Sequence, residues 1–506
     1  MINKWFIINI LLWFSLIFVT SLQSKSQSSF KIDYATPENE YLDGGAVDSL
    51  GNAYLVGARL IAYSDTSDGL LMKVYNSGLY ETKIISKPDT NLSYATCTLL
   101  ESGNLFVTGK SQKQGSANFD MLVIMVMDTA LNVITEKNFG LPPGYINYSA
   151  QEAILTNQGD IVIAALVGYW NGFRIKYDNY LLKLNPNGDT LITHVYKTGM
   201  DIFDSQPYCW RKMPQSNDLM LIGRCFNASN QNELEFFDED LNLLRYNRLN
   251  DPRYLGGLQF SSEIWLDSTQ FLMTQHMVDH SGPTHEYYIG VYRLDTSGHY
   301  FQELRLDHVD TIDYIAFYKS MACYNDTNIY IGGFQCFNVG PIDIPSLVYL
   351  YLIDRDLNLV GFKNLGGDTY YEALFVLSTP DNGCLLIANR YDSLPYCEND
   401  AVIWKVMPED MTIVTSVEEM TTLLETNPTW PNPAHNEVFI SLASFEMGEP
   451  LRLRLFDMQG SKCFDKQILV TGNTLKVELK TLNPGTYFYE IEGSQGNRIQ
   501  SKIIKH

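Results

Sequence analysis

Positively charged residues are scarce in this sequence. Its 506 residues contain 36 Lys and Arg against 58 Asp and Glu, which gives a net charge of −22 at pH 7. The imbalance lies in the first 429 residues, which hold 27 basic and 50 acidic groups, whereas the remainder holds nine and eight. A chain this acidic repels phosphate backbones, so we exclude nucleic acid as a partner.

Motifs for common catalytic chemistry are also missing. The sequence has no Gly-x-Ser-x-Gly nucleophile turn, no phosphate-binding glycine loop and no Cys-x-x-Cys pair. It therefore predicts no metal and no cofactor, and it favours a non-enzyme over an enzyme. Carboxylates are plentiful, so a glycosidase pair stays open as an alternative.

Long apolar runs are confined to the N-terminus. Residues 1–4 carry one positive charge, residues 5–20 are almost wholly apolar, and residues 21–29 are small and polar. Sixteen helical residues span only about 24 Å, which is less than the thickness of a bilayer core. This order of segments predicts a signal peptide over residues 1–24, cleaved between Ser21 and Ser26, with a membrane anchor as the alternative.

A unit of 52 to 58 residues recurs through the body of the chain. Its clearest marker is a polar turn followed by an apolar strand, as in GNAYLVG at residues 51–57 and GNLFVTG at residues 103–109. Seven copies begin at Gly51, Gly103, Gly159, Asn217, Thr269, Thr327 and Asn382. Each copy reads as four short strands rich in Val, Ile, Tyr and Phe, bounded by Gly, Asn and Asp, and helical signals are nearly absent.

Repeats of four strands predict the blades of a β-propeller, because one such sheet cannot bury both of its faces alone. We therefore predict an all-β chain with a seven-bladed propeller over residues 30–407; six or eight blades are the alternatives. The seventh copy lacks a fourth strand, and residues 30–35 belong to no other copy. They are expected to complete the last blade and close the ring, which removes an exposed edge.

The first copy carries a resemblance to known propeller repeats. Residues 48–57, DSLGNAYLVG, resemble bacterial repeats in which a strand ends Asp-Ser-x-Gly-Asn-x-Tyr-x-x-Gly, and the later copies match loosely. The resemblance implies the fold, and such repeats share no single activity.

Two cysteine pairs are candidates for disulfides, which an exported protein can form. Cys209 and Cys225 lie on either side of a turn at residues 215–218, so they are expected to face each other across a hairpin. Cys336 and Cys397 occupy equivalent loops of neighbouring repeats. Connectivity is not readable from sequence, and free buried thiols are the alternative.

A separate module follows the repeats. Residues 408–429 are rich in Thr, Glu and Ser, contain no aromatic residue, and are expected to be a linker. Short strands of alternating polarity then fill residues 430–506, for which we predict a small immunoglobulin-like β-sandwich.

This module resembles the type A sorting domain of type IX secretion, a family of the Bacteroidetes. The resemblance rests on Pro431, Asn432 and Pro433 at the start, LFDMQG up to Gly460, LNPGTYF around Gly485, and SKIIK at residues 501–505. Trp430 stands where the family more often has Tyr. The resemblance implies the type IX machinery as a partner and passage through the periplasm to the outer-membrane surface or the medium. An ordinary carbohydrate-binding or immunoglobulin-like domain is the alternative.

Two loops hold candidate ligand-binding residues. Tyr169, Trp170 and Phe173 follow the second strand of the third copy, and such rings suit flat ligands such as sugars. The equivalent place in the fifth copy holds His276, His280 and His285. No zinc spacing fits these histidines, because a zincin needs Glu directly after the first His and Met277 stands there. Aromatic rings buried between blades and histidines exposed on the surface are the alternatives.

Acidic turns that begin at Asp238 and Asp354 raise the question of calcium. An EF-hand needs Gly at its sixth position and Glu at its twelfth, but after Asp238 these positions hold Leu243 and Leu249. The turns recur at one place in the repeat, so we interpret them as Asp side chains that bond to nearby backbone.

The sequence therefore predicts a secreted or cell-surface binding module exported by type IX secretion. Its ligand is a glycan, a peptide or a partner protein. An extracellular hydrolase acting on a polymer and a structural surface-layer protein are the alternatives.

Overall fold

The computed structural model describes the chain in segments, over residues 28–61, 66–116, 121–172, 175–196, 205–225, 231–249, 262–279, 286–306, 312–325, 328–336, 345–391, 399–413, 429–430, 434–442, 448, 450–457, 462–469, 474–493 and 498–505. The predicted signal peptide and most of the predicted linker lie outside these residues. The chain divides into two compact units after Ile413. Within the described segments, no helix is both long and apolar enough to cross a membrane.

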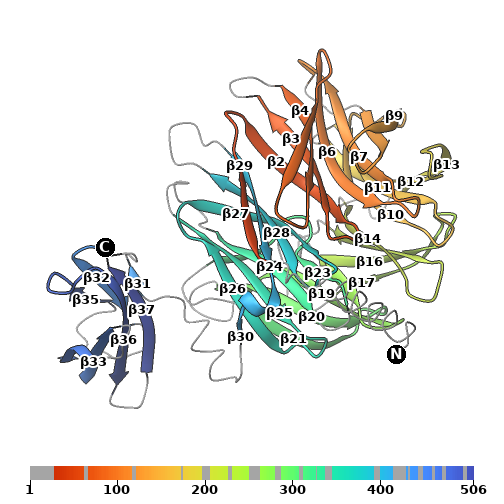
Figure 1. Cartoon of the computed structure of the whole chain (residues 1–506). Coiled ribbons are helices and arrows are strands. Elements are labelled where there is room, and N and C mark those ends of the chain that lie inside the picture. The colour runs from red at the N-terminus through yellow and green to blue at the C-terminus, as the bar shows by residue number, and fades with distance from the viewer. Residues whose placement is uncertain are drawn as a thin grey trace, which may run out of the picture. The chain divides into compact units, whose positions relative to one another are not determined.

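Five four-stranded sheets and one ten-stranded sheet form the larger unit, and the ten-stranded sheet consists of two neighbouring antiparallel sets of strands, so that we number seven blades along the chain (Figure 1). Blade 1 contains β2 (Asn39–Val47), β3 (Ala53–Leu60), β4 (Ser67–Val74) and β5 (Tyr80–Ile85). Blade 2 contains β6 (Thr90–Leu99), β7 (Leu105–Lys113), β8 (Met121–Met127) and β9 (Val133–Gly140). Blade 3 contains β10 (Asn147–Leu155), β11 (Ile161–Trp170), β12 (Ile175–Leu184) and β13 (Thr190–Tyr196). Blade 4 contains β14 (Ser205–Lys212), β15 (Leu219–Cys225), β16 (Gln231–Phe237) and β17 (Leu243–Arg248).

The remaining blades complete the ring. Blade 5 contains β18 (Glu263–Trp265), β19 (Gln270–Asp279), β20 (Glu286–Asp295) and β21 (Tyr300–Leu306). Blade 6 contains β22 (Ile312–Ile315), β23 (Met321–Cys323), β24 (Ile329–Cys336), β25 (Leu347–Ile353), β26 (Leu359–Gly366) and the short β30 (Thr412–Ile413). Blade 7 contains β27 (Tyr370–Ser378), β28 (Cys384–Tyr391), β29 (Asn399–Val406) and β1 (Phe30–Tyr34). A single parallel bridge between Tyr287 and Ile312 links blades 5 and 6.

Burial falls from the middle of each blade to its outer edge. In blade 3 the second strand, β11, is buried at eight consecutive positions, from Ile161 to Gly168, whereas the outermost strand, β13, has no buried residue. Middle strands lose the alternation of a half-buried strand because a neighbouring blade covers each of their faces. This explains why the apolar run after each turn was the clearest repeat signal.

The first strand of several blades carries a β-bulge at the same place. The register shifts beside Asp43 in β2, Ala95 in β6 and Leu374 in β27, and β10 and β14 have equivalent shifts. A bulge bends its strand and redirects one side chain. At the first bulge, Gly44 approaches the backbone of blade 2 so closely that only glycine fits, because a Cβ on Gly44 would lie 2.4 Å from the carbonyl oxygen of Ala95.

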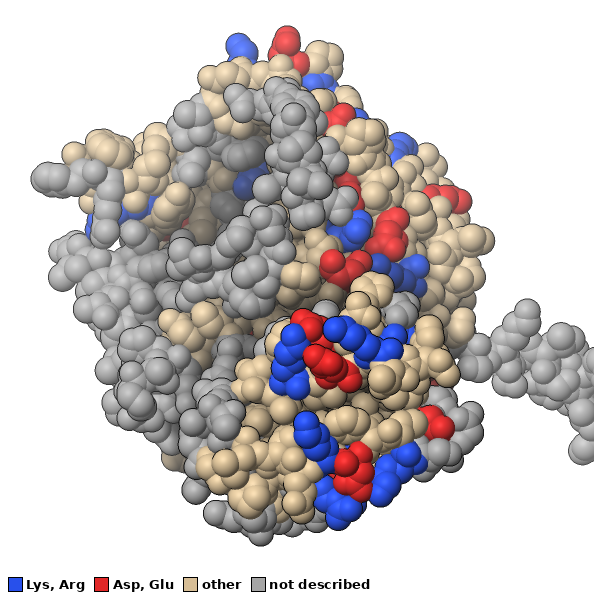
Figure 2. All heavy atoms as spheres, turned by 90° about the vertical axis from the view of Figure 1, so that its left-hand side faces the viewer, with Lys and Arg blue, Asp and Glu red and all other residues tan. Residues whose placement is uncertain are grey.

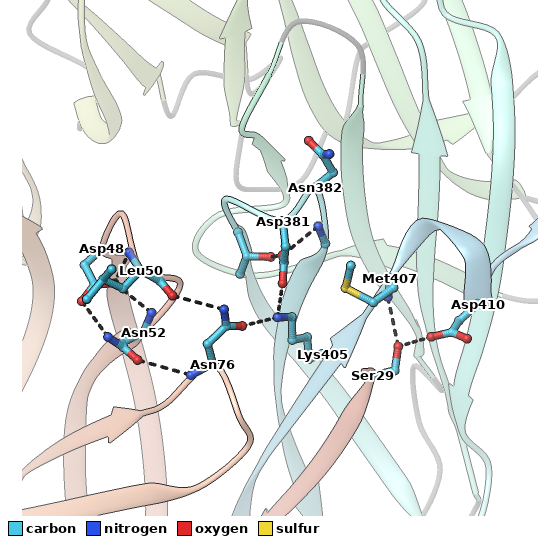
Figure 3. Close-up of polar contacts among 12 residues, drawn as sticks. Ser29, Asp48, Leu50, Asn52, Asn76, Asp381, Asn382, Lys405, Met407 and Asp410 are labelled. Atoms are coloured by element: carbon cyan, nitrogen blue, oxygen red, sulfur yellow. Dashed lines mark hydrogen bonds and ion pairs between the residues drawn. The ribbon is translucent and has the colours of Figure 1, made fainter. Parts of the chain in front are cut away.

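The N-terminal strand closes the ring, as the sequence predicts. β1 pairs antiparallel with β29, with Phe30 opposite Lys405 and Tyr34 opposite Ala401. Beside this pair the Lys405 ammonium, almost fully buried, contacts the Asp381 carboxylate of blade 7 and the Asn76 side chain of blade 1 (Figure 3). Blades 7 and 1 are thus joined by the chain that runs from β1 to β2 and by the hydrogen bond from Lys405 to Asn76, and the ion pair with Asp381 holds Lys405 in place within blade 7.

The acidic turns bond to their own backbone. The Asp238 Oδ1 accepts hydrogen bonds from the amides of Asp240 (3.0 Å) and Asn242 (2.8 Å), and Asp354 does the same at its turn. The turn interpretation is confirmed. Leu241 within this turn has a φ of 62°, a left-handed conformation that is costly for leucine, yet its side chain is buried.

The start of the predicted linker belongs to the propeller. A 3-10 helix at Pro408–Asp410 follows β29, and β30 then pairs with β26 of blade 6, with Ile413 opposite Gly361. The Ser29 Oγ also accepts a hydrogen bond from the Met407 amide at 3.0 Å (Figure 3). The chain therefore leaves this unit after Ile413 and not after residue 407, because an open edge of blade 6 accepts one more short strand.

The smaller unit is a sandwich of two sheets. One sheet is formed by β31 (Thr429–Trp430), β32 (Glu437–Ser441) and β35 (Thr474–Glu478), and the other by β33 (Pro450–Asp457), β34 (Lys462–Leu469), β36 (Gly485–Gly493) and β37 (Arg498–Lys505). Alternate residues of both sheets, such as Val438, Leu453 and Ile491, meet in one core. The predicted fold class, an all-β seven-bladed propeller followed by a small sandwich, is confirmed.

Candidate functional site

Strands from all seven blades surround a central channel of about 730 Å³. β2, β6, β10, β14, β18, β23 and β27 all contribute to its wall. Apolar side chains of Val47, Leu99 and Ile154 form part of this wall. Among its described residues are six charged groups: Asp43, Lys110, Glu152, Arg211, Glu263 and Lys319. None of these six residues was predicted from the sequence as part of a site.

Arg211 joins three blades across the channel wall. It lies in β14 of blade 4, and its Nη1 is 2.6 Å from the Glu152 Oε1 of blade 3. Its Nε contacts the carboxylate of Glu263, a buried residue of blade 5. Such fork-shaped contacts with charged partners are strong and directional, so both carboxylates are held in place by one guanidinium.

A second polar group forms around the bulge of blade 1. The Tyr318 hydroxyl, from the segment between β22 and β23, donates a hydrogen bond to Asp43, and Lys110 of β7 lies near the same carboxylate. Burial raises the pKa of Asp43 to about 6, and the Tyr318 hydrogen bond and the Lys110 charge oppose this shift. Burial lowers the pKa of Lys110, and the charge of Asp43 acts against that change.

Tyr318 keeps its proton. Burial, followed by the negative charge of Asp43, raises the pKa of the Tyr318 hydroxyl well above its usual value. Tyr318 and Tyr324 both line the channel, and they are 46% and 54% exposed. The channel therefore offers two accessible rings beside fixed hydrogen-bonding groups, and Tyr318 acts as a donor and not as a base.

The predicted aromatic site lies away from this channel. Tyr169 and Trp170 end β11, where Tyr169 packs edge-on against Tyr145 at 5.7 Å and 59% of Trp170 is exposed. Neither residue lines the channel. Phe173 lies outside the described residues, so a sugar site on this loop stays a prediction.

The histidine loop differs from the prediction. His276 lies inside β19 and is fully buried, with its ring stacked on Tyr314 of blade 6 at 3.8 Å. The prediction that it lies on a loop is wrong, because β19 continues to Asp279. His280 and His285 lie outside the described residues.

The two cysteine pairs remain unproven. In the hairpin of β14 and β15, Cys209 pairs with Ile222 and Cys225 with Ser205, so the two cysteines are not opposite each other. The bulge beside Cys209 contributes to this offset. Cys336 ends β24, and Cys397 lies outside the described residues.

Charge on the surface is mixed where the structure describes it. Figure 2 shows basic and acidic side chains beside one another on one face, without a large described patch of either sign. Among the described residues, no group of three or more His, Cys, Asp and Glu side chains is arranged to hold a metal ion.

Four of the channel residues occupy a similar place in the sequence repeat. Asp43, Glu152, Arg211 and Glu263 all lie in the first strand of a blade, a few residues before the turn that marks each copy. Because first strands face the axis, the repeat alignment locates these positions. It does not reveal which of them meet across the axis.

Comparison with known proteins adds a family for one unit. A family model described as a secretion system C-terminal sorting domain matches residues 429–506. No curated protein sequence is significantly similar to this chain.

Solved structures resemble the chain only distantly. Polysaccharide lyase Uly1 has a TM-score of 0.46 and 8% identity, covering 76% of this chain and 95% of its own. An ulvan lyase of family PL25 has a TM-score of 0.44 and 10% identity, and the match covers 78% of this chain and 99% of the lyase. PorZ, a surface component of the type IX secretion system of Porphyromonas gingivalis, has a TM-score of 0.31 and 13% identity, and the match covers 90% of this chain and 68% of PorZ. At these scores none of them bears on activity. The sorting-domain match does bear on export: residues 429–506 are a type IX secretion C-terminal sorting domain, and the chain travels through the periplasm to the cell surface or the medium.

Proposed function

We propose that this chain is a binding module, delivered outside the cell by type IX secretion, whose ligand enters the central channel. The observation that carries this proposal is the channel itself, to which all seven blades contribute wall residues. Its volume of about 730 Å³ falls within the range of ligand pockets. A rigid ring of strands holds these residues in place, which lowers the entropic cost of binding.

The pairing of the ionisable groups favours binding over hydrolysis. A glycosidase needs two carboxyl groups in different roles, one as an acid and one as a base or nucleophile. Glu152 and Glu263 are both engaged by Arg211, and Asp43 accepts a hydrogen bond from Tyr318. Groups held in this way are suited to orienting a ligand.

One observation favours the alternative, an extracellular hydrolase acting on a polymer. Burial raises the pKa of Asp43 to about 6, which is the direction that a general acid requires. Under this alternative, incubation with a polymer releases shorter products, and Asp43→Asn abolishes their release. Under the proposal the ligand is recovered intact.

The test is to block the channel. Ser93→Trp places a large ring at a residue of the channel wall, and Ser49→Trp places the same ring on an exposed turn of blade 1 as a control. The purified exported protein and both variants are screened for binding to arrays of glycans and peptides, with thermal unfolding as a check on folding. The proposal expects Ser93→Trp to lose the ligand and Ser49→Trp to keep it. A ligand that both folded variants retain contradicts it.

A further inference from the structure

The charges of the channel balance. Among the residues that the structure describes, its wall contains three acidic residues, Asp43, Glu152 and Glu263, and three basic residues, Lys110, Arg211 and Lys319. The charges of these described wall residues sum to zero, although the chain as a whole carries a net charge of −22. The channel is thus electrically unlike the acidic body that surrounds it.

Five of these six groups are already engaged in two clusters. Arg211 contacts Glu152 and Glu263, and Asp43 lies beside Lys110 and accepts the Tyr318 hydrogen bond. A charged ligand must break one of these pairs or remain unpaired inside the protein. Either course is costly, because a buried charge without a partner is strongly destabilising.

A hydroxyl-rich ligand meets no such obstacle. A hydroxyl both donates and accepts, so it can donate to the carboxylates of Asp43 or Glu152 and accept from Lys110 or Arg211 without displacing an ion pair. Hydrogen bonds to ionised partners are the stronger ones. Fixed donors beside fixed acceptors therefore match the edge of a sugar ring.

The wall also offers surfaces for the faces of such rings. Tyr318 and Tyr324 are each about half exposed, and they come from the same short stretch of blade 6. Val47, Leu99 and Leu377 add apolar area. Aromatic and aliphatic groups next to polar ones suit a ligand with C–H faces and hydroxyl edges.

We infer that the channel binds an uncharged, hydroxyl-rich glycan segment. The inference rests on the proposed function and adds the class of ligand. Uronate-bearing and sulfated glycans, although rich in hydroxyls, are rejected because they bring charge into a balanced channel. The channel thus discriminates against charged glycans through the cost of breaking an existing ion pair, and not because charged glycans make fewer contacts.

Matched probes separate the ligand classes. Neutral oligosaccharides are compared with uronate-bearing and sulfated ones, and the panel includes a galacturonate oligomer both as its neutral methyl ester and as the free acid. We expect neutral probes to bind with little dependence on salt, because no counterions are released. We expect each anionic probe to bind at least about tenfold more weakly than its neutral counterpart.

Two pairs of variants test the wall. Asp43→Asn leaves a surplus positive charge and should recover binding of anionic probes, whereas Lys110→Gln leaves a surplus negative charge and should not. Tyr324→Ala should lower the affinity for neutral probes about tenfold, since stacking of a sugar on an aromatic ring contributes about 1 kcal/mol to binding. Tyr246→Ala is the control, because Tyr246 is similarly exposed but lies on the outermost strand of blade 4.

The outcomes distinguish the two proposals. An anionic glycan or a peptide that binds best, in a salt-dependent way, and is lost in Ser93→Trp overturns the neutral ligand class and leaves the channel as the binding site. A ligand of any class that Ser93→Trp does not affect overturns the channel itself. Failure of every glycan and peptide to bind overturns both.

Discussion

Glu40 should make the propeller less stable as the pH rises. It lies in β2 at the seam between blades 1 and 7, is fully buried, and accepts a hydrogen bond from Thr36. Nearby, Arg59 is paired with Asp68 at 2.8 Å and Arg390 with Asp400 at 3.3 Å. No salt bridge to Glu40 forms among the described residues. Burial raises its pKa to about 7, and the negative charge of Asp400 adds to this shift.

The magnitude follows from the shift. The pKa rises from 4.5 to about 7, and each unit corresponds to 1.36 kcal/mol, so ionisation of Glu40 costs the folded state about 3 kcal/mol. Between these two values the folded state binds more protons than the unfolded state, so stability falls as the pH rises. The loss of stability is complete above the pKa of Glu40 in the folded state and absent below its pKa in the unfolded state.

The assay compares Glu40→Gln with the parent protein across this pH range. Glutamine keeps an acceptor for Thr36 but carries no charge, so the variant should unfold several degrees higher at pH 8 and at nearly the same temperature as the parent at pH 4.5. Glu101→Gln, on an exposed turn, is the control and should leave the profile unchanged. A stabilisation by Glu40→Gln that is equal at both pH values, or a loss of stability at pH 8, would refute the reasoning.

Three further predictions address closure, turns and export. Lys405→Met should lower the free energy of unfolding by about 3–5 kcal/mol, because it leaves Asp381 without its cation; the further change Asp381→Asn should restore part of the loss in denaturant unfolding. Burial alone would raise the pKa of Asp381, but the hydrogen bond and the charge of Lys405 outweigh burial and hold this pKa below its usual value. The pair therefore stabilises the fold near neutral pH, and this stabilisation is lost as the pH falls through the lowered pKa of Asp381. Leu241→Gly should be less destabilising than Leu241→Ala by about 1 kcal/mol, since a φ of 62° penalises any Cβ; the opposite order would contradict the turn geometry. Deletion of residues 430–506 should trap the protein in the periplasm, and fractionation showing normal surface display of the truncated chain would contradict export through this domain.

The ring and its closure were readable because they depend on local patterns. Each copy begins with a turn and an apolar strand, and residues 30–35 were left over by the repeat count, which assigns them to the incomplete last blade. Turn chemistry was readable for the same reason, since Asp238 meets partners only two and four residues ahead. In such patterns the interacting residues lie close together in the sequence.

The channel was not readable because its partners come from different copies. Arg211 meets Glu152 and Glu263 from two other blades, at separations of 59 and 52 residues. One sequence gives no sign of which first-strand residues face one another. The histidine prediction failed because it relied on the equivalent place in the third copy, whereas β19 continues to Asp279 and its buried His276 stacks on the rings of Tyr287 and Tyr314.

The position of β1 also sets an order for folding. Phe30 and Lys405 are strand partners although 375 residues separate them, so the first strand has no place in a sheet until the chain has been made almost to the end of the propeller. Contacts between such distant residues form slowly, because a long loop must close first. The sorting domain comes later still, at residues 429–506. A chain that breaks off before blade 7 therefore lacks both the seam that seals the ring and the signal that sends it out, and a truncated, open ring is not exported.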